Sequence, residues 1–480
     1  MAVEVLTVPS TVKPTARLGI GAISWSLFEG ARNPYVMLIM IYVFTPYISA
    51  AVVGDPVRGQ ELVSRYAQYA GWIVMITAPF LGATVDQMGR RKGWLGLVVA
   101  AMCALMASLW FVRADGTGIA LATCMLMVMA LNVLFPYSEV LHNSLLVRAA
   151  GLRGAHKASG LALALGNLFA VLALAFTAWA FALPGKVAWP FVPAAPLFGL
   201  DAAAHEHERI VGPMAALIFA LGALPLFLFT PDAPRTRVTL LRALIDGAST
   251  LRGMLKSIGS NRDAAIFLVS RMFYVDGMTA ILLYYGLFAA GVMRWGPLEL
   301  LFNGILLSIL SVLGGFVGRW MDGSLGPKRA LQISVGMSLV GLVALLGMAP
   351  DKILYVWSHE VATQPPLWHG PVFRTLPDVV FVLIGFMSAV FITAQYASSR
   401  TLLTRLTPPS QTGAYFGLFA LSGTATVWLG SFMVNLGTRI FHTQQGGFAT
   451  ITLLLALGFV GLSFVRGGKA EIPVDVPPGQ

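Results

Sequence analysis

The sequence predicts an all-α membrane protein whose twelve transmembrane helices form two pseudo-symmetric six-helix bundles. Three observations lead to this prediction. Hydrophobic residues occupy 57% of the 480 positions and charged residues only 11%, whereas soluble domains are about 25% charged. Apolar runs that can cross the hydrocarbon core, which is about 30 Å thick, recur along the whole chain. A short charged signature occurs once in each half, which is typical of an internal repeat.

The apolar runs define the elements in order. A helix needs about 20 mostly apolar residues to cross the core. Unbroken apolar runs predict helices, because a helix satisfies its own backbone hydrogen bonds in lipid. The predicted spans cover residues 18–50, 66–87, 93–112, 119–147, 158–182, 210–230, 264–293, 298–321, 330–349, 377–403, 413–436 and 448–465.

A polar segment divides these spans six and six. We therefore predict an N-terminal six-helix bundle over residues 1–230, a cytoplasmic linker over 231–263 and a C-terminal six-helix bundle over 264–480. The linker combines six basic residues with leucines and isoleucines at helical spacing. This pattern predicts an amphipathic helix on the membrane surface. A plain solvated linker helix is the alternative.

The net charge of +11 is explained by how the chain is oriented in the membrane. If the N-terminus is cytoplasmic, the predicted cytoplasmic segments hold more than twice as many Lys and Arg residues as the external segments. This bias is the positive-inside pattern, which sets the orientation of membrane proteins. We therefore expect both termini in the cytoplasm, no nucleic-acid partner and an integral protein of the bacterial inner (plasma) membrane.

Motifs of other function classes are not found. The sequence contains no Gly-x-x-x-x-Gly-Lys-Ser/Thr nucleotide loop, no Gly-x-Ser-x-Gly elbow and no His-Glu-x-x-His helix. Cys103 and Cys124 lie in apolar spans, where they are expected to be buried. The cluster from His205 to Glu208 offers metal ligands without a second ligand set. We expect no enzyme, no cofactor and no metal site.

The repeated signature resembles the loop 2–3 motif of the major facilitator superfamily. The first copy runs from Gly82 to Lys92 with the pattern Gly, three residues, Asp, two residues, Gly, Arg-Arg-Lys, and the second copy is looser. Its predicted gating residues are Gly82, Asp86, Gly89, Arg90, Arg91 and Asp322. The resemblance implies that helices 1, 4, 7 and 10 line a central cavity. It also implies that Asp86 pairs with Arg90 and faces the start of helix 11 near Gly413 as a gate.

Two other stretches are similar to the vacuole-effluxer group of this superfamily. One is the opening helix from Ser24 to Tyr35, and the other is the helix 10–11 junction from Ser399 to Pro409, followed by the segment Tyr415–Leu418. The group includes autophagy-related amino-acid exporters of the yeast vacuole and many bacterial members. The resemblance covers both halves of the chain and implies export of amino acids or small peptides.

Ionisable residues within spans are the first candidates for function, because each costs about 2.5–3.5 kcal/mol to insert. Four such residues are Glu29 and Arg32 in helix 1 and Arg271 and Asp276 in helix 7. Glu29 lies about 16 Å and Asp276 about 18 Å from the start of its span. The resemblance places both acids on the cavity wall, where a carboxylate could couple protons. The alternative is structural pairing, either Glu29 with Arg32 or Arg32 with Asp276.

Polar and aromatic residues on the same four helices complete the predicted pocket. They are Asn33, Tyr35, Asn132, Tyr137, Tyr274, Tyr284, Gln395 and Tyr396. These groups offer hydrogen bonds and cation–π contacts to an ammonium or a carboxylate, and core packing is the alternative for each aromatic. Glu139, near the cytoplasmic end of helix 4, is a further candidate.

The sequence as a whole predicts a monomeric secondary active transporter that works by alternating access. Its expected partners are a small-molecule substrate, protons as the coupling ion and membrane lipid. Two alternatives stay open: export of lipid-like or drug-like amphiphiles, and a non-transporting membrane receptor on the same fold.

Overall fold

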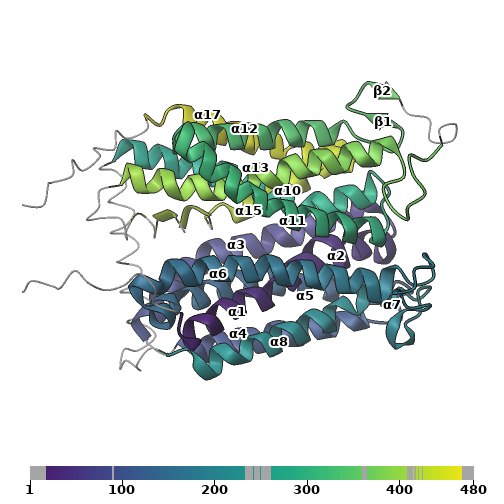
Figure 1. Cartoon of the computed structure of the whole chain (residues 1–480), viewed down its shortest axis with the longest axis horizontal. Coiled ribbons are helices and arrows are strands. Elements are labelled where there is room, and N and C mark those ends of the chain that lie inside the picture. The colour runs from purple at the N-terminus through teal and green to yellow at the C-terminus, as the bar shows by residue number, and fades with distance from the viewer. Residues whose placement is uncertain are drawn as a thin grey trace, which may run out of the picture.

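The computed structural model is built almost entirely of helices (Figure 1). It describes residues 18–88, 91–232, 261–358, 365–407 and 425–466, and the separate positions 242, 249, 415, 418, 419 and 421–423. The amphipathic helix predicted within the linker lies outside the described residues.

The first half of the chain contributes six long helical segments. The first consists of α1 (Ile20–Pro34), η1 (Tyr35–Tyr42), α2 (Phe44–Tyr47) and η2 (Ile48–Val52). The others are α3 (Pro56–Met88), α4 (Arg91–Ser108), α5 (Leu121–Ser144), α6 (Leu146–Thr177) and α8 (Val211–Phe229). Short elements complete this half: η3 (Leu109–Phe111), η4 (Ala178–Ala182), η5 (Leu197–Gly199) and α7 (Glu206–Arg209).

The second half repeats this plan. Its helices are α10 (Arg262–Gly291), α11 (Pro297–Ser324), α12 (Pro327–Leu346), α13 (Leu376–Leu406), α15 (Val427–Phe441), α16 (Gln444–Ala449) and α17 (Ile451–Ser463). Within the described residues, ten helices are long and apolar enough to cross a membrane. The helices α3 and α15 occupy the positions of the predicted second and eleventh spans. The prediction of an all-α membrane fold with two six-helix bundles is confirmed, and a two-stranded hairpin, β1 (Lys352–Ile353) and β2 (Trp357–Ser358), is added in a loop.

Local sequence signals account for where several helices begin. Asn261 caps α10 by accepting a hydrogen bond from the backbone N–H of Ala264 at 3.1 Å. Thr375 and Asp378 form a reciprocal capping box at the start of α13. Proline occupies the first turn of α11, α12 and α13, where its missing N–H has no intrahelical partner to lose.

Proline also explains why the first span is irregular. Pro34 lies at the junction between α1 and η1, and Pro46 lies just before η2. Each proline removes a backbone donor from the ladder, and the chain continues through the π-helical turns η1 and η2. The Thr45 hydroxyl donates to the Ile39 carbonyl at 2.8 Å, which satisfies an acceptor at this irregularity.

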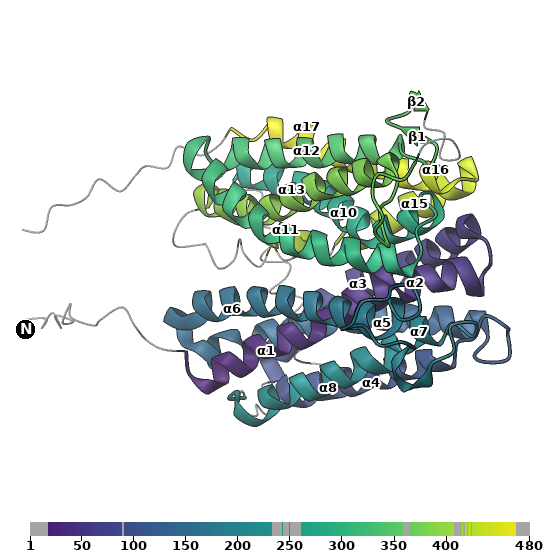
Figure 2. The same ribbon diagram turned by 45° about the vertical axis from the view of Figure 1, so that its right-hand side comes forward.

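The twelve segments pack as two neighbouring bundles (Figures 1 and 2). In the first half, α1 packs on α6 and α8, and α3 packs on α5. In the second half, α13 packs on α11 and α12, and α10 packs on α17. The halves meet where α3 contacts α15 and where α6 contacts α11. The surface between them is therefore lined by helices from both repeats.

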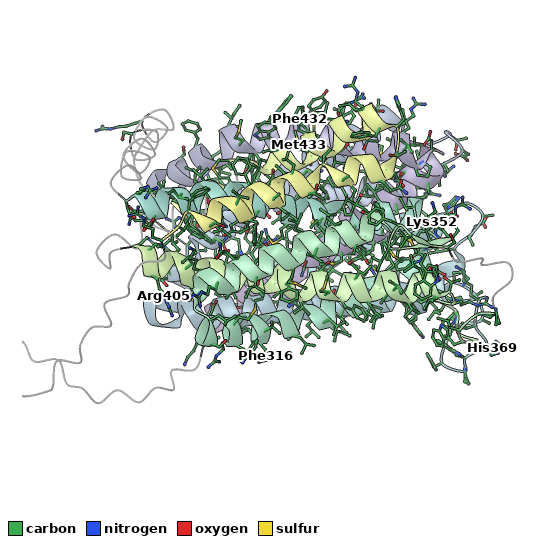
Figure 3. The ribbon with its side chains drawn as sticks, turned by 90° about the horizontal axis from the view of Figure 1, so that it is seen from above. Phe316, Lys352, His369, Arg405, Phe432 and Met433 are labelled. Carbon is green, nitrogen blue, oxygen red and sulfur yellow. The ribbon has the colours of Figure 1, made fainter. Side chains whose placement is uncertain are left out.

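Two ends of this structure matter for the site. We call the end where α1 begins and α17 ends the terminal end, and the opposite end, which carries β1 and β2, the hairpin end. Figure 3 places Arg405 at the terminal end and Lys352 and His369 at the hairpin end. Between the two ends, large apolar side chains such as Phe316 and Leu228 are about 70% exposed, as expected for surfaces that face lipid.

Candidate functional site

The centre of the first half contains a charged cluster on α1 and α5. Both carboxylate oxygens of Glu29 accept hydrogen bonds from Nη2 of Arg32 at 2.8 Å. Arg32 also donates to the Ser138 hydroxyl at 3.4 Å, lies 3.7 Å from Glu139 and stacks over Phe135. The guanidinium is buried, so these partners offset the cost of removing a cation from water. The predicted pairing of Glu29 with Arg32 is confirmed.

Sequence reasoning missed a histidine that belongs to this cluster. His142 of α5 is fully buried, and its ring stacks on Trp25 at 4.3 Å and on Phe28 at 4.6 Å. Its Nε2 lies 2.8 Å from the Trp25 carbonyl oxygen, and its Nδ1 lies 3.6 Å from Glu29. The available signal was spacing, because His142 follows Glu139 by three residues and therefore lies on the same face of the helix.

The two charged candidates of the second half do not pair with the first half. Arg271 donates to the Phe419 carbonyl at 2.6 Å and to the Ser422 hydroxyl at 2.7 Å. Asp276 accepts a hydrogen bond from the backbone N–H of Gly430 at 2.7 Å. The alternative in which Arg32 pairs with Asp276 is therefore wrong.

The expectation that both acids line one open cavity is wrong for Asp276 in this structure, and for Glu29 it stays a prediction. The Glu29 side chain is 32% exposed, whereas Asp276 is only 4% exposed. The physical reason is the close approach of α15, whose backbone at Gly430 covers the Asp276 carboxyl group. Asp276 thus joins α10 to α15.

The other predicted residues of the first half connect its helices. Asn33 donates to a backbone carbonyl of α6 at 2.7 Å. The hydroxyl of Tyr35 donates to Asn132 of α5 at 3.3 Å. The Tyr137 hydroxyl forms a hydrogen bond with Thr77, which ties α5 to α3. These contacts hold α1 and α5 in the register that brings Arg32 to Glu139.

The predicted residues of the second half fall into two groups. Tyr274 bonds to Ser399 of α13 at 2.7 Å, and Gln395 bonds to a serine of α12, so both are internal to this half. Tyr396 is different: it is 43% exposed and lies near Glu139 of the first half. Because the Glu139 side chain is itself 51% exposed, solvent reaches between the halves at this level. We call this region the inter-half opening.

A set of amide side chains joins the halves at the hairpin end. The buried Gln60 of α3 donates to the Thr438 hydroxyl at 2.9 Å and to the Gln444 carbonyl at 3.1 Å. Gln444 in turn donates to the Pro56 carbonyl at 3.0 Å. Asn435 donates to a backbone carbonyl of α3 at 2.9 Å. We call this set the Gln60 clasp, and it closes the hairpin end.

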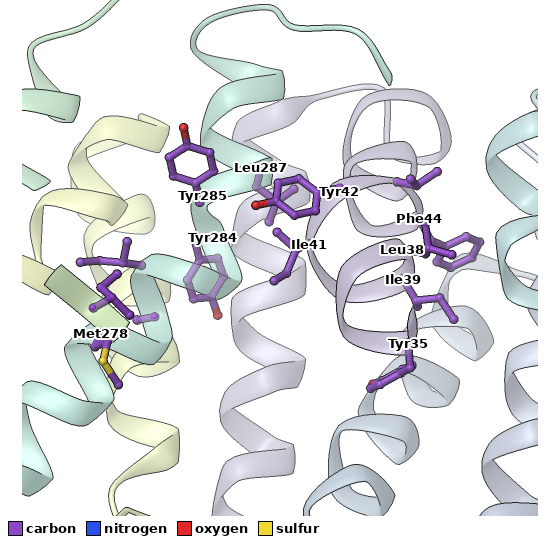
Figure 4. Packing of buried hydrophobic residues seen from close by; sticks show 14 of the residues in the cluster. Tyr35, Leu38, Ile39, Ile41, Tyr42, Phe44, Met278, Tyr284, Tyr285 and Leu287 are labelled. Atoms are coloured by element: carbon purple, nitrogen blue, oxygen red, sulfur yellow. The ribbon is translucent and has the colours of Figure 1, made fainter. Parts of the chain in front are cut away.

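Close backbone packing extends this closure toward the middle of the molecule. A Cβ atom at Gly71 of α3 would lie 2.6 Å from the Cα of Trp428, so this position has no room for a side chain. Figure 4 shows Ile41 and Tyr42 of η1 next to Leu287 and Tyr285 of α10. The Gln60 clasp and this packing together place the inter-half opening on the terminal side.

The repeated signature is partly described. Gly82 and Asp86 lie on α3, but the Asp86 side chain is not described. Gly89, Arg90 and Gly413 lie outside the described residues, and so does the predicted contact with Gly413. The backbone N–H of Arg91 donates to Asp232 at 2.9 Å. Asp322 accepts from the Ser398 hydroxyl at 2.6 Å, which joins α11 to α13. The gating role of the signature stays a prediction.

The histidines of the 205–208 cluster lie beside a carboxylate and do not assemble a metal site within the described residues. Glu208 lies 3.1 Å from His205 and 3.2 Å from His207. The next residue, Arg209, donates twice to the Trp110 carbonyl, at 2.8 and 2.7 Å. In the described part of the chain, no group of three His, Cys, Asp or Glu side chains is arranged to hold a metal ion.

Known proteins share both the sequence and the fold. A family model described as "Vacuole effluxer Atg22 like" matches residues 147–472. Autophagy-related protein 22 of Vanderwaltozyma polyspora is 25% identical over 244 residues, which cover 50% of this chain and 43% of that protein. The uncharacterized MFS-type transporter YxiO of Bacillus subtilis is 20% identical over 477 residues, 95% of this chain and 96% of that protein. A crystal structure of a D-xylose-proton symporter has a TM-score of 0.63 at 12% identity and covers 94% of this chain and 97% of that chain.

The two repeated bundles share the fold of the major facilitator transporters to which the chain is similar. Since the family model matches more than half of its residues, the chain belongs to the Atg22-like vacuole effluxer family. The chain matches less than half of the length of the curated Atg22 proteins. The likeness to the xylose symporter shows the fold alone.

Proposed function

We propose that this protein is a proton-coupled secondary active transporter that exports amino acids or small peptides by alternating access. One observation carries the proposal: two carboxylates, the partly exposed Glu29 and the exposed Glu139, lie beside the buried Arg32, and Glu139 borders the inter-half opening. Charged groups at this depth are expensive to insert, so they favour a role in solute or ion passage over a role in packing. Membership of a family described as vacuole effluxers supports the transport of a solute across a membrane.

The chemistry of the opening suits a solute with an ammonium group. Two carboxylates against one guanidinium leave a net negative charge where solvent enters. Tyr396 of the other half adds an aromatic face within electrostatic reach of Glu139. A cationic amine held between Glu139 and Tyr396 would contact both halves, which is what a carrier requires in order to move its substrate.

The contacts between the halves give the alternating step a physical basis. The Gln60 clasp and the packing at Gly71 close the hairpin end in this conformation. Opening that end requires these bonds to break while the terminal end closes. We assign the closing contacts at the terminal end to the signature around Asp86. The working unit is a monomer. Both termini lie in the cytoplasm of a bacterial cell.

Counterflow in proteoliposomes tests this function. Purified protein is reconstituted in vesicles loaded with unlabelled amino acids or dipeptides, and uptake of the labelled solute is followed. We expect saturable counterflow of at least one of these solutes, and acceleration of transport by an imposed pH gradient. Glu29→Gln should strongly reduce transport, because it removes one of the two carboxylates of the opening.

The matched control is Asp115→Asn, which makes the same change of charge in an exposed loop. It should transport like the unsubstituted protein. Absence of counterflow for every amino acid and dipeptide would contradict the proposed substrate class. Counterflow of an amphiphilic dye instead would support the alternative of a drug or lipid exporter, and ligand binding without flux would support a receptor.

A further inference from the structure

The hydrogen bonds of His142 determine which of its ring nitrogens carries a proton. Nε2 lies 2.8 Å from the Trp25 carbonyl oxygen, which can only accept, so Nε2 must be the donor. Among the described residues, Nδ1 has no hydrogen-bond partner, although His142 is fully buried. The indole N–H of Trp25 donates to the His142 carbonyl at 2.7 Å, and this second bond holds the ring in place.

The unpartnered Nδ1 faces a carboxylate. It lies 3.6 Å from Oε2 of Glu29, too far for a hydrogen bond but within reach after a small movement. An unprotonated Nδ1 and an ionised carboxylate are both hydrogen-bond acceptors, so no hydrogen bond can form between them. One added proton would convert this pair into a donor and an acceptor, so the geometry is complete except for that proton.

The charged groups around the imidazole ring do not balance one another. Glu29 and Arg32 are the charged groups of the described residues that interact electrostatically with the imidazole. Glu139, on the same helix as His142, lies 3.7 Å from Arg32. With a neutral histidine, the set formed by Glu29, Arg32, Glu139 and His142 carries one net negative charge. One proton neutralises it, and so does one ammonium group.

We propose that His142 is the proton-accepting residue of this transporter and that its protonation competes with binding of a substrate ammonium at Glu139. The proposal rests on the proposed function and adds a specific proton site to it. His142 is buried, so the proton reaches it through Glu29, whose side chain is 32% exposed in the inter-half opening.

The transfer conserves protons and charge at each step. When the site is open to the side of higher proton concentration, water delivers a proton to a carboxylate oxygen of Glu29. The protonated Glu29 then donates it to the lone pair on Nδ1, which leaves Glu29 as a carboxylate and His142 as an imidazolium. The stacked rings of Trp25 and Phe28 stabilise the imidazolium through cation–π attraction.

Competition with the substrate follows from the shared guanidinium. Once Nδ1–H donates to Glu29, the attraction between Glu29 and Arg32 weakens, because two donors now compete for one carboxylate. Arg32 can then turn from Glu29 toward Glu139, which is 3.7 Å away. Glu139 covered by Arg32 has little attraction left for an ammonium group. Proton uptake therefore favours substrate release, which is the order required for exchange of substrate against protons.

His142→Gln tests the transport part of this proposal. Glutamine can still donate to the Trp25 carbonyl but cannot be protonated near neutral pH. We expect measurable counterflow, which moves no net protons, together with loss of the acceleration by a pH gradient. The control is His369→Gln at an exposed site of the hairpin end, which should retain both. Full gradient-driven transport by His142→Gln would overturn the proposal.

A spectroscopic measurement keeps the proposal testable if the variant does not transport. An imidazolium stacked on Trp25 quenches indole fluorescence more than a neutral ring does. We expect a pH-dependent quench in the unsubstituted protein that disappears in both Trp25→Phe and His142→Gln. Identical titration curves for all three proteins would refute protonation of His142. Absence of counterflow in the unsubstituted protein would instead refute the proposed function, whatever the fluorescence shows.

Discussion

Arg32 shows how one residue organises the site. Its guanidinium is buried but contacts the carboxylates of Glu29 and Glu139, the Ser138 hydroxyl and the ring of Phe135. A cation buried in a protein is tolerated when its donors are satisfied, and removal of one partner is then costly. Because Arg32 bonds to α1 and contacts α5, a change in either carboxylate is transmitted between these two helices.

Asp276 makes a second residue-scale point, since its only hydrogen bond in the described structure is from the Gly430 N–H. Asp276→Ala leaves that buried donor unpaired, and we expect a loss of about 1–3 kcal/mol in the free energy of unfolding. Asp276→Asn keeps an acceptor oxygen and should lose less than the alanine variant. Thermal unfolding of the purified protein in detergent measures both. Equal destabilisation by the two substitutions would argue against the Gly430 bond as the stabilising contact.

At the scale of elements, α3 and α15 form an extensive contact between the halves. Gly71 allows the two helices to approach, and a methyl group there would lie 2.6 Å from the Trp428 Cα. The Gln60 clasp adds hydrogen bonds further toward the hairpin end. Tight packing and directional bonds on one pair of helices favour a discrete closed state over a continuum of separations.

Gly71→Ala should therefore open the hairpin end. Overpacking costs about 1–3 kcal/mol, and moving α3 away from α15 relieves it. The measurement is the distance between spin labels at Arg58 and Arg439, which lie on these two helices. We expect a longer distance in Gly71→Ala than in the unsubstituted protein.

The control for this prediction is Gly160→Ala on α6, where an added methyl group has no neighbour within 4 Å. Both substitutions replace a helical glycine, so the gain in helix propensity is common to them. An unchanged label distance in Gly71→Ala, or an equal lengthening in Gly160→Ala, would contradict the role of this packing.

At the scale of the whole molecule, the distribution of charge predicts orientation. Basic residues concentrate toward the terminal end, and the positive-inside pattern places that end in the cytoplasm. The inter-half opening would then face the cytoplasm in this conformation. An exporter loads its substrate from that side, so orientation and proposed direction agree.

Cysteine labelling tests the orientation. Val356, between β1 and β2, is 87% exposed, and Thr404 near the end of α13 is also exposed. We expect Val356→Cys to react with a membrane-impermeant maleimide on intact spheroplasts, and Thr404→Cys to react only after permeabilisation. The unsubstituted protein provides the background from Cys103 and Cys124. The reverse pattern would show that the termini lie outside.

Ten of the twelve predicted spans match helices of the described residues that are long and apolar enough to cross a membrane, because membrane insertion is a local property. About 20 consecutive residues decide whether a helix crosses the core, and no distant contact is needed. The same locality applies to Glu29 and Arg32, which are three residues apart and pair on one helix face. The resemblance to the superfamily could also be recognised from sequence, because the residues of the repeated signature keep their spacing within a single loop.

The sequence by itself thus determined the fold class and the two repeated halves, and it left open whether Arg32 pairs with Glu29 or with Asp276. The tertiary structure alone decided that Asp276 bonds to Gly430, that His142 stacks on Trp25 beside Glu29, and that Gln60 closes the hairpin end. The reason is physical. These partners lie more than a hundred residues apart in the chain, so no periodicity records their contact, and it arises only when separate helices pack together.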